Sequence, residues 1–181
     1  VMTPLNHPYE IIFVDDCSSD RSPELMESFK KEFPEAVRVI PLPERSGQTF
    51  ALRKGLDAAS GSVAATLDAD LQNDPADIPR MVGKLDEGYD VVSGWRVDRQ
   101  DRFLDRRLPS IVANNMIRWT TNVDIHDNGC SLKAYRRDVL TDVRLYGELH
   151  RFIPALAHAA GARVTEVPVS HHPRRYGKAK Y

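Results

Sequence analysis

The chain has 181 residues, of which 41% are hydrophobic and 28% are charged, and its formal net charge is −1. This length and composition fit one ordinary globular domain, and the near-neutral charge argues against a general nucleic-acid binder. The two cysteines, Cys17 and Cys130, are too few and too isolated for a disulfide scaffold or a zinc site.

The first half of the chain alternates short apolar runs with amphipathic segments. β-Branched or small apolar residues mark four predicted strands, at 10–14, 37–41, 62–67 and 90–94. Predicted helices lie between successive strands, at about 22–32, 47–60 and 75–88. Ser22 is expected to cap the first helix, with Pro23 at its first position. The alternation indicates an α/β fold with a doubly wound, mostly parallel sheet and helices on both faces.

The alternation weakens after residue 94. Residues 95–181 are interpreted as a more irregular half, built around "SLKAY" (131–135) and "RVTEVPV" (163–169). Because no linker separates this half from residues 1–94, we predict one continuous domain over residues 1–181.

Acidic residues follow two of the predicted strands, at the carboxyl ends where ligands bind in such sheets. Asp15 and Asp16 come directly after the first strand, and "LDADLQNDP" (67–75) ends the third. An EF-hand loop is excluded for the second cluster, because Asn73 and Pro79 stand where that loop needs glycine and glutamate.

Two interpretations of residues 67–75 remain. One is a polar turn with helix-capping aspartates, which accounts well for Asp74. The other is a hard-metal site, because alternate residues of an extended turn point the same way, so that Asp68, Asp70 and Gln72 would offer three oxygens to one cation. Mg²⁺ or Mn²⁺ held by few protein oxygens completes its shell with substrate phosphates. An enzyme that uses a nucleotide-diphosphate sugar needs such a cation.

Several segments occur in the order and spacing of glycosyltransferase family 2: "YEIIFVDDCSSDRS", "GQTFALRKG", "LDADLQNDP", "VSGWR", "HDNGCSLKAYRR", "HRFIPAL" and "HHPRRYGKAKY". The chain resembles more narrowly the polyprenyl-phosphate branch of that family, which contains dolichyl-phosphate mannose synthases and bacterial undecaprenyl-phosphate glycosyltransferases. The resemblance implies a GT-A fold. It also implies inverting, metal-dependent transfer of a hexose from a UDP- or GDP-linked sugar to undecaprenyl or dolichyl phosphate, with Mg²⁺ or Mn²⁺ as cofactor.

The resemblance also implies roles for individual residues, with residues 1–94 as the nucleotide-sugar-binding half and 95–181 as the acceptor-binding half. Donor binding is implied for Asp15, Asp16, Asp68 and Asp70, and metal binding for Asp68, Asp70 and Gln72. The residues implied for catalysis are Arg96, Arg106 and the candidate base Asp127. Binding of the acceptor phosphate is implied for Arg106, Ser110, Arg174 and Lys180.

The chemistry of the residues themselves leaves the role of Asp127 open. It is either a turn residue before Gly129 or a functional carboxylate. A phosphate monoester, with a second pKa near ~6, is already a nucleophilic anion at neutral pH. Asp127 would then orient a cation or the sugar instead of removing a proton. The basic C-terminal residues from Arg174 onward are either a solubilising end or a clamp for the lipid phosphate, and we expect the clamp.

Three departures from the family pattern stand out. The family begins with a strand and a P-x-Y-N-E segment that this chain lacks, so we expect the first strand to be missing between those at 10–14 and 62–67. Cys17 stands where the family usually has glycine, and Ala179 where it has serine.

The resemblance places the protein at the cytoplasmic face of a membrane, most simply the bacterial inner membrane, anchored by segments after residue 181. The expected partners are the nucleotide sugar, the polyprenyl phosphate and the membrane surface, with no nucleic acid; a homo-oligomer is left open. Two alternatives also stay open. One is a GT-A enzyme that acts on a sugar hydroxyl in a polysaccharide, and the other is a non-catalytic nucleotide-sugar-binding module, against which Asp68, Asp70 and Gln72 argue.

Overall fold

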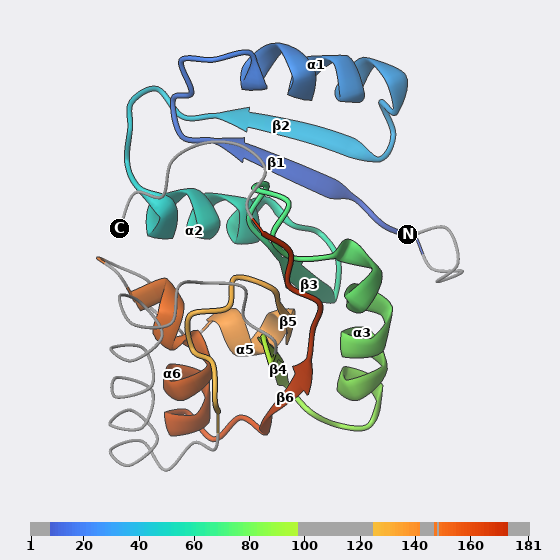
Figure 1. Cartoon of the computed structure of the whole chain (residues 1–181), viewed down its shortest axis with the longest axis vertical. Helices are drawn as coiled ribbons and strands as arrows, with labels where there is room; N and C mark the ends of the chain where they lie inside the picture. Colours follow the sequence, from blue (N-terminus) through green and yellow to red (C-terminus); the bar gives the residue numbers. More distant parts are fainter. Residues whose placement is uncertain (1–7, 98–124, 142–146, 148, 174–181) are drawn as a thin grey trace.

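The computed structural model describes residues 8–97, 125–141, 147 and 149–173. Strands among these residues form two sheets (Figure 1). In the first, β1 (Ile11–Asp15) pairs in parallel with β2 (Val37–Pro41). The second sheet has the order β3-β5-β4-β6. Its strands are β3 (Val63–Thr66), β4 (Val91–Trp95), β5 (Lys133–Arg136) and β6 (Val164–Pro168).

The helical segments are α1 (Ser22–Glu32), α2 (Gln48–Ala58), the 3-10 turn η2 (Pro75–Asp77), α3 (Ile78–Asp86), α5 (Arg137–Thr141), η4 (Leu149–Phe152) and α6 (Ile153–Ala159). The strands and helices predicted in the first half are confirmed, with ends shifted by two residues or fewer, except that the third predicted helix begins as the 3-10 turn η2 and becomes α-helical at Ile78. The predicted cap is wrong, because Arg21 is the N-cap residue and Ser22 lies inside the helix. The backbone N–H of Ser22 donates instead to Oδ1 of Asp20 at 2.9 Å.

The four-stranded sheet is mixed. β5 runs antiparallel to both of its neighbours, whereas β4 and β6 run parallel. β5 comes from the second half of the chain and lies between β3 and β4 of the first half. Both halves therefore contribute to one sheet, and the loop before β5 is brought beside the loop after β3.

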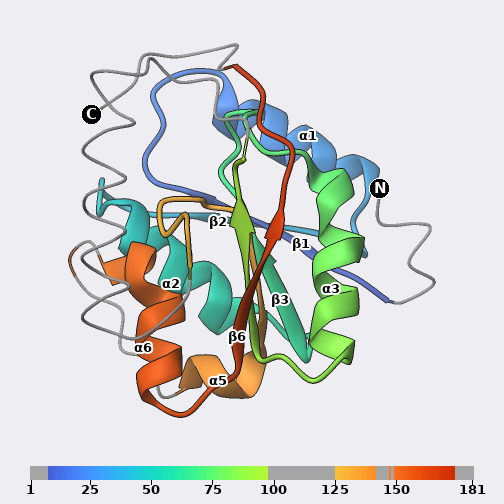
Figure 2. The ribbon, with the colours of Figure 1, turned by 60° about the horizontal axis from the view of Figure 1, so that its bottom comes forward.

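Helices cover both faces of this sheet (Figure 2). On one face, α3 buries Met81 and Leu85 against Val92 and Leu132. On the other face, α6 and α5 pack with Tyr135 and the side chains that share its cluster, Val91, Leu140, Ile153 and Ala157. Neighbouring residues of β4 thus enter opposite cores, as the two-residue period of a strand requires.

Helix α2 packs against both sheets. A Cβ at Gly55 would lie 3.2 Å from Cγ2 of Val14, so the glycine lets α2 approach β1 closely. On its other side, Leu52 and Leu56 pack against the core that contains Tyr135. In the described residues, no strand pairs with the second edge of β1 or of β3. The strand expected between these edges stays a prediction. Within the same residues, no helix is long and apolar enough to cross a membrane.

Candidate functional site

The acidic loop, residues 67–74, follows β3 and turns sharply. Leu71 has a φ of 62°, in the left-handed region, and Oδ1 of Asp70 accepts the backbone N–H of Gln72 at 3.1 Å. The loop is therefore not the extended segment that the alternation argument assumed. That step of the sequence reasoning was wrong, because a left-handed residue breaks the two-residue alternation.

The carboxylates of Asp68 and Asp70 nevertheless interact. Burial raises the pKa of Asp68, and the negative charge of Asp70 raises it further. Hydrogen bonds from Ser131 and Gln48 oppose this shift, and Nε2 of Gln48 donates to Oδ1 of Asp68 at 2.8 Å. A cation placed between the two carboxylates would relieve their repulsion. Among the described residues, no group of three His, Cys, Asp or Glu side chains is arranged to hold a metal ion.

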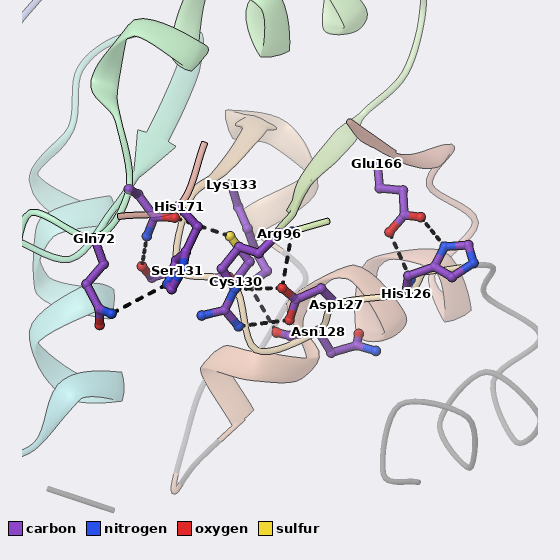
Figure 3. Close-up of polar contacts among 11 residues, drawn as sticks. Gln72, Arg96, His126, Asp127, Asn128, Cys130, Ser131, Lys133, Glu166 and His171 are labelled. Atoms are coloured by element: carbon purple, nitrogen blue, oxygen red, sulfur yellow. Dashed lines mark hydrogen bonds and ion pairs between the residues drawn. The ribbon is translucent and has the colours of Figure 1, made fainter. Parts of the chain in front are cut away.

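Gln72 lies at the far end of the same loop, beside the segment that follows β6. Its Nε2 is 3.5 Å from Nε2 of His171 (Figure 3). The backbone carbonyl oxygen of Gln72 accepts the backbone N–H of His172 at 2.8 Å. Asp74 is confirmed as a capping residue, because its Oδ1 accepts the backbone N–H of Ala76 at 2.9 Å. The capping interpretation thus holds for Asp74, and the metal interpretation remains for Asp68, Asp70 and Gln72.

Ser131 and Asn73 hold the acidic loop in place. Oγ of Ser131 accepts the backbone N–H of Asp68 at 3.2 Å and Nδ2 of Asn73 at 3.0 Å. Asn73 also forms an isolated antiparallel bridge with His171, and its Oδ1 accepts the thiol of Cys130 at 3.6 Å. Sequence reasoning missed both roles; the only signal was that both residues belong to segments shared with the family.

Asp15 and Asp16, the residues expected to bind the donor, both hold loops. The oxygens of Asp15 accept the backbone N–H of Ser18 at 3.2 and 3.3 Å. Those of Asp16 accept the backbone N–H groups of residues 46–47, at 2.6 and 3.0 Å. Cys17 has a φ of 59°, which explains why glycine suits this position. Asp16 therefore fixes the start of α2, the helix whose first residue reaches Asp68.

Arg96 and Asp127 form an ion pair at the end of β4 (Figure 3). Nε of Arg96 lies 2.6 Å from Oδ2 of Asp127, and Nη2 lies 2.9 Å from Oδ1. The side chains are 11% and 7% exposed, respectively. A Cβ at Gly129 would lie 3.3 Å from Nη2, so the glycine leaves room for the guanidinium. The arrangement is a bidentate, largely buried pair.

Lys133 is a further residue that sequence reasoning missed. It is buried at the start of β5, and its Nζ donates to the carbonyl oxygens of Asn128, at 3.2 Å, and Cys130. Burial lowers the pKa of Lys133, whereas the carboxylates of Asp127 and Asp68 both raise it. The available signal was a lysine flanked by the apolar residues Leu132 and Ala134. The hydrogen bond from the backbone N–H of Asp68 to Oγ of Ser131 joins the acidic loop to the segment between Asp127 and Lys133, so the acidic loop and the ion pair belong to one site.

The turn that carries Asp127 is held from its other side by Glu166 of β6. Oε2 of Glu166 accepts the backbone N–H of His126 at 2.8 Å, and Oε1 contacts Nδ1 of its ring. The His126 ring stacks on Trp95, with ring centroids 4.5 Å apart. Four residues predicted for the site, Arg106, Ser110, Arg174 and Lys180, lie outside the described residues.

The α/β fold, with an acidic loop after β3, is that of a GT-A glycosyltransferase domain. The chain belongs to the family described as glycosyl transferase family 2, whose model matches residues 5–144. Among its relatives, a dodecaprenyl-phosphate galacturonate synthase from Rhizobium johnstonii is 42% identical over 99% of this chain and 54% of its own length. An undecaprenyl-phosphate 4-deoxy-4-formamido-L-arabinose transferase from Salmonella choleraesuis is 43% identical over 98% of this chain and 54% of its own length. The chain spans about half the length of these relatives.

Solved structures confirm the fold. A glucosyl-3-phosphoglycerate synthase from Mycobacterium tuberculosis, in complex with phosphoglyceric acid, has a TM-score of 0.68 at 21% identity, over 91% of this chain and 61% of that one. A mannosyltransferase from Pyrobaculum calidifontis, in complex with GDP-Man and Mn²⁺, has a TM-score of 0.65 at 20% identity, over 94% and 50%. The predicted GT-A fold and the predicted family are therefore confirmed.

Proposed function

We propose that the protein containing this chain transfers a sugar from a nucleotide-diphosphate donor to a polyprenyl phosphate, with inversion at the anomeric carbon. One observation carries the proposal: the segment from Asp127 to Lys133 joins a buried arginine ion pair to the loop with two interacting carboxylates. Such a site offers a place for a cation beside a fixed positive charge, as the meeting of two phosphate-bearing substrates requires. The names of the relatives support a polyprenyl phosphate as acceptor.

The residues present fit a divalent metal. Asp68 and Asp70 lie two residues apart in the loop after β3, and both offer carboxylate oxygens, the ligands that hard divalent cations prefer. Asp68 and Asp70, with the amide oxygen of Gln72, would hold Mg²⁺ or Mn²⁺, and substrate phosphates would complete the oxygen shell. When bound, the metal would neutralise charge on the departing diphosphate. Mn²⁺ in structures of the same fold is in keeping with this assignment.

The other residues would bind and orient the substrates. Asp16 fixes the loop that begins α2, which would form part of the donor pocket together with Asp15. Arg96 would stabilise negative charge between donor and acceptor. Binding of the acceptor phosphate is proposed for Arg106, Ser110, Arg174 and Lys180. An oxygen of the acceptor phosphate would attack the anomeric carbon as its bond to the diphosphate breaks.

A lipid acceptor places the proposed reaction at a membrane surface, and the cytoplasmic face is proposed because nucleotide sugars are made in the cytoplasm. The test is transfer by the intact protein in nanodiscs. Radiolabelled UDP- and GDP-sugars would be supplied with Mn²⁺ and either undecaprenyl phosphate or a polysaccharide acceptor. We expect a labelled lipid product from at least one donor and none with undecaprenol, which lacks the phosphate. Labelling of the polysaccharide alone would overturn the proposed acceptor.

A further inference from the structure

Asp127 was the candidate base, but its position suits another task. Both of its carboxylate oxygens accept hydrogen bonds from the guanidinium of Arg96, at 2.6 and 2.9 Å. Charge-assisted, bidentate hydrogen bonds of this kind are among the strongest in proteins. They stabilise the ionised carboxylate and so make it a weaker proton acceptor. A carboxylate held in this way is poorly suited to take a proton from a substrate.

The surrounding contacts also restrain Asp127. Glu166 holds the backbone N–H of the preceding residue, His126, at 2.8 Å. On the other side, Lys133 donates to the carbonyl oxygens of Asn128 and Cys130. The turn is therefore anchored on both sides of Asp127, and the carboxylate is aimed at Arg96. This is the arrangement expected of a group that fixes another group in place.

The direction of the other N–H groups of Arg96 shows toward which part of the site Asp127 would hold the guanidinium. Its pairing with Asp127 uses Nε and one hydrogen of Nη2, and the planar fork directs the remaining N–H groups elsewhere. In Figure 3 a terminal nitrogen of Arg96 points away from Asp127, on the side where Ser131 and Gln72 lie. That side carries the acidic loop, where the phosphates would be bound.

We infer that Asp127 is a positioning residue, which holds the guanidinium of Arg96 toward the reacting phosphates and does not act as a general base. The inference rests on the proposed function. The step balances without a base: the acceptor phosphate supplies an anionic oxygen, a carbon–oxygen bond forms at the anomeric carbon, and the diphosphate leaves with the electrons of the broken bond. Arg96 contributes a fixed positive charge, and the effect of that charge on the rate depends on where the guanidinium is held.

The test is a double-mutant cycle in the intact protein, with Arg96→Ala, Asp127→Ala and the combined variant. If Asp127 acts through Arg96, each single variant lowers kcat/KM by ~100-fold and the combination lowers it no further. Millimolar guanidinium should partly restore Arg96→Ala, where Asp127 can hold it, but not the combined variant. Asp138→Asn, at an exposed residue of α5, is the control and should behave as wild type. Multiplied losses in the combined variant, or equal rescue of both, would overturn the inference.

The pH profile separates positioning from base catalysis. Asp127→Asn keeps one oxygen as an acceptor, so we expect a loss of ~10-fold in kcat/KM with a profile parallel to that of wild type. Removal of a general base would cost ~10²–10⁴-fold and change the acidic limb of the profile. Either of those results would overturn the inference.

A binding cycle keeps the inference testable if the proposed reaction fails. The same variants would be titrated by calorimetry with UDP or GDP in Mn²⁺ and with farnesyl phosphate. Equal weakening of phosphate binding by both single variants and by the combined one supports positioning. Unchanged binding in Asp127→Ala, with weaker binding in Arg96→Ala, contradicts it. Failure of wild type to transfer sugar would defeat the proposed function alone.

Discussion

The hydroxyl of Ser131 accepts the backbone N–H of Asp68 across the boundary between β3 and β5, at 3.2 Å. The same oxygen accepts Nδ2 of Asn73, so one serine holds both ends of the acidic loop. Its neighbour Cys130 belongs to the turn that carries Asp127, and Lys133, at the start of β5, donates to two carbonyl oxygens of that turn. The position of the acidic loop therefore depends on the same turn that positions Arg96.

Replacing Ser131 by alanine should loosen the acidic loop. The backbone N–H of Asp68 and the amide of Asn73 would each lose a partner, and one such hydrogen bond contributes about 1 kcal/mol. We expect Mn²⁺-dependent affinity for the nucleotide to fall by roughly 5-fold per lost bond, measured by calorimetry. Ser28→Ala, on the exposed face of α1, is the control. Unchanged affinity in Ser131→Ala would show that the loop does not need this anchor.

Asp70→Asn should abolish Mn²⁺-dependent binding of the nucleotide while leaving the fold intact. The amide oxygen can still accept the backbone N–H of Gln72. The pKa of Asp68 is raised by burial and then by the charge of Asp70, and the substitution removes the second of these causes. The melting temperature should therefore stay level or rise slightly. Asp74→Asn is a matched control from the same loop, because asparagine caps a helix as well as aspartate does. The metal assignment is wrong if both variants bind the nucleotide with Mn²⁺ equally well.

Glu10 should make folding stability depend on pH. Its Oε1 accepts hydrogen bonds from the hydroxyl and from the backbone N–H of Ser60, at 2.6 Å each. These bonds lower the pKa of Glu10 from 4.5 to about 2. Because the folded pKa is depressed, this stabilisation is present above the unfolded pKa and is lost as the pH falls from about 4.5 toward 2.

Urea unfolding of wild type and Glu10→Gln measures this effect. The wild-type advantage in the free energy of unfolding should be larger at pH 7 than at pH 3.5, with Glu35→Gln, an exposed glutamate, as the control. A difference that stays constant between these two pH values would contradict the assignment.

Local patterns predicted the elements well because strands and helices are decided over a few residues. The apolar run before Asp15 and the small residues before Asp68 each formed the expected strand. The prediction that Asp68, Asp70 and Gln72 share one loop needed only their adjacency. Their geometry could not be predicted, because the left-handed Leu71 has no glycine or asparagine to signal it.

Contacts between distant segments were beyond local patterns. Arg96 and Asp127 are 31 residues apart and meet because β5 inserts between β3 and β4. Nothing in the alternation of strands and helices predicts an antiparallel insertion, since its pairing is set by tertiary packing. The sequence could therefore raise the question of what Asp127 does, but only the structure shows its contact with Arg96.

Lys133 should be required for the turn that unites the two parts of the site. Its ammonium supplies the hydrogen bonds to the carbonyl oxygens of Asn128 and Cys130, and the residue is 3% exposed. Lys133→Met keeps the length of the side chain but leaves two acceptors without this donor, at a cost of ~1–3 kcal/mol each. Removing a buried charge offsets part of this cost.

We therefore expect Lys133→Met to lower the free energy of unfolding by about 2 kcal/mol in urea titrations. Transfer activity should fall further than partial unfolding explains, because Arg96 and the acidic loop lose their common support. Lys84→Met, which removes an exposed lysine paired with Glu87, is the matched control and should change stability by less than ~0.5 kcal/mol. A Lys133→Met variant with wild-type stability and activity would show that the turn holds its shape without the ammonium.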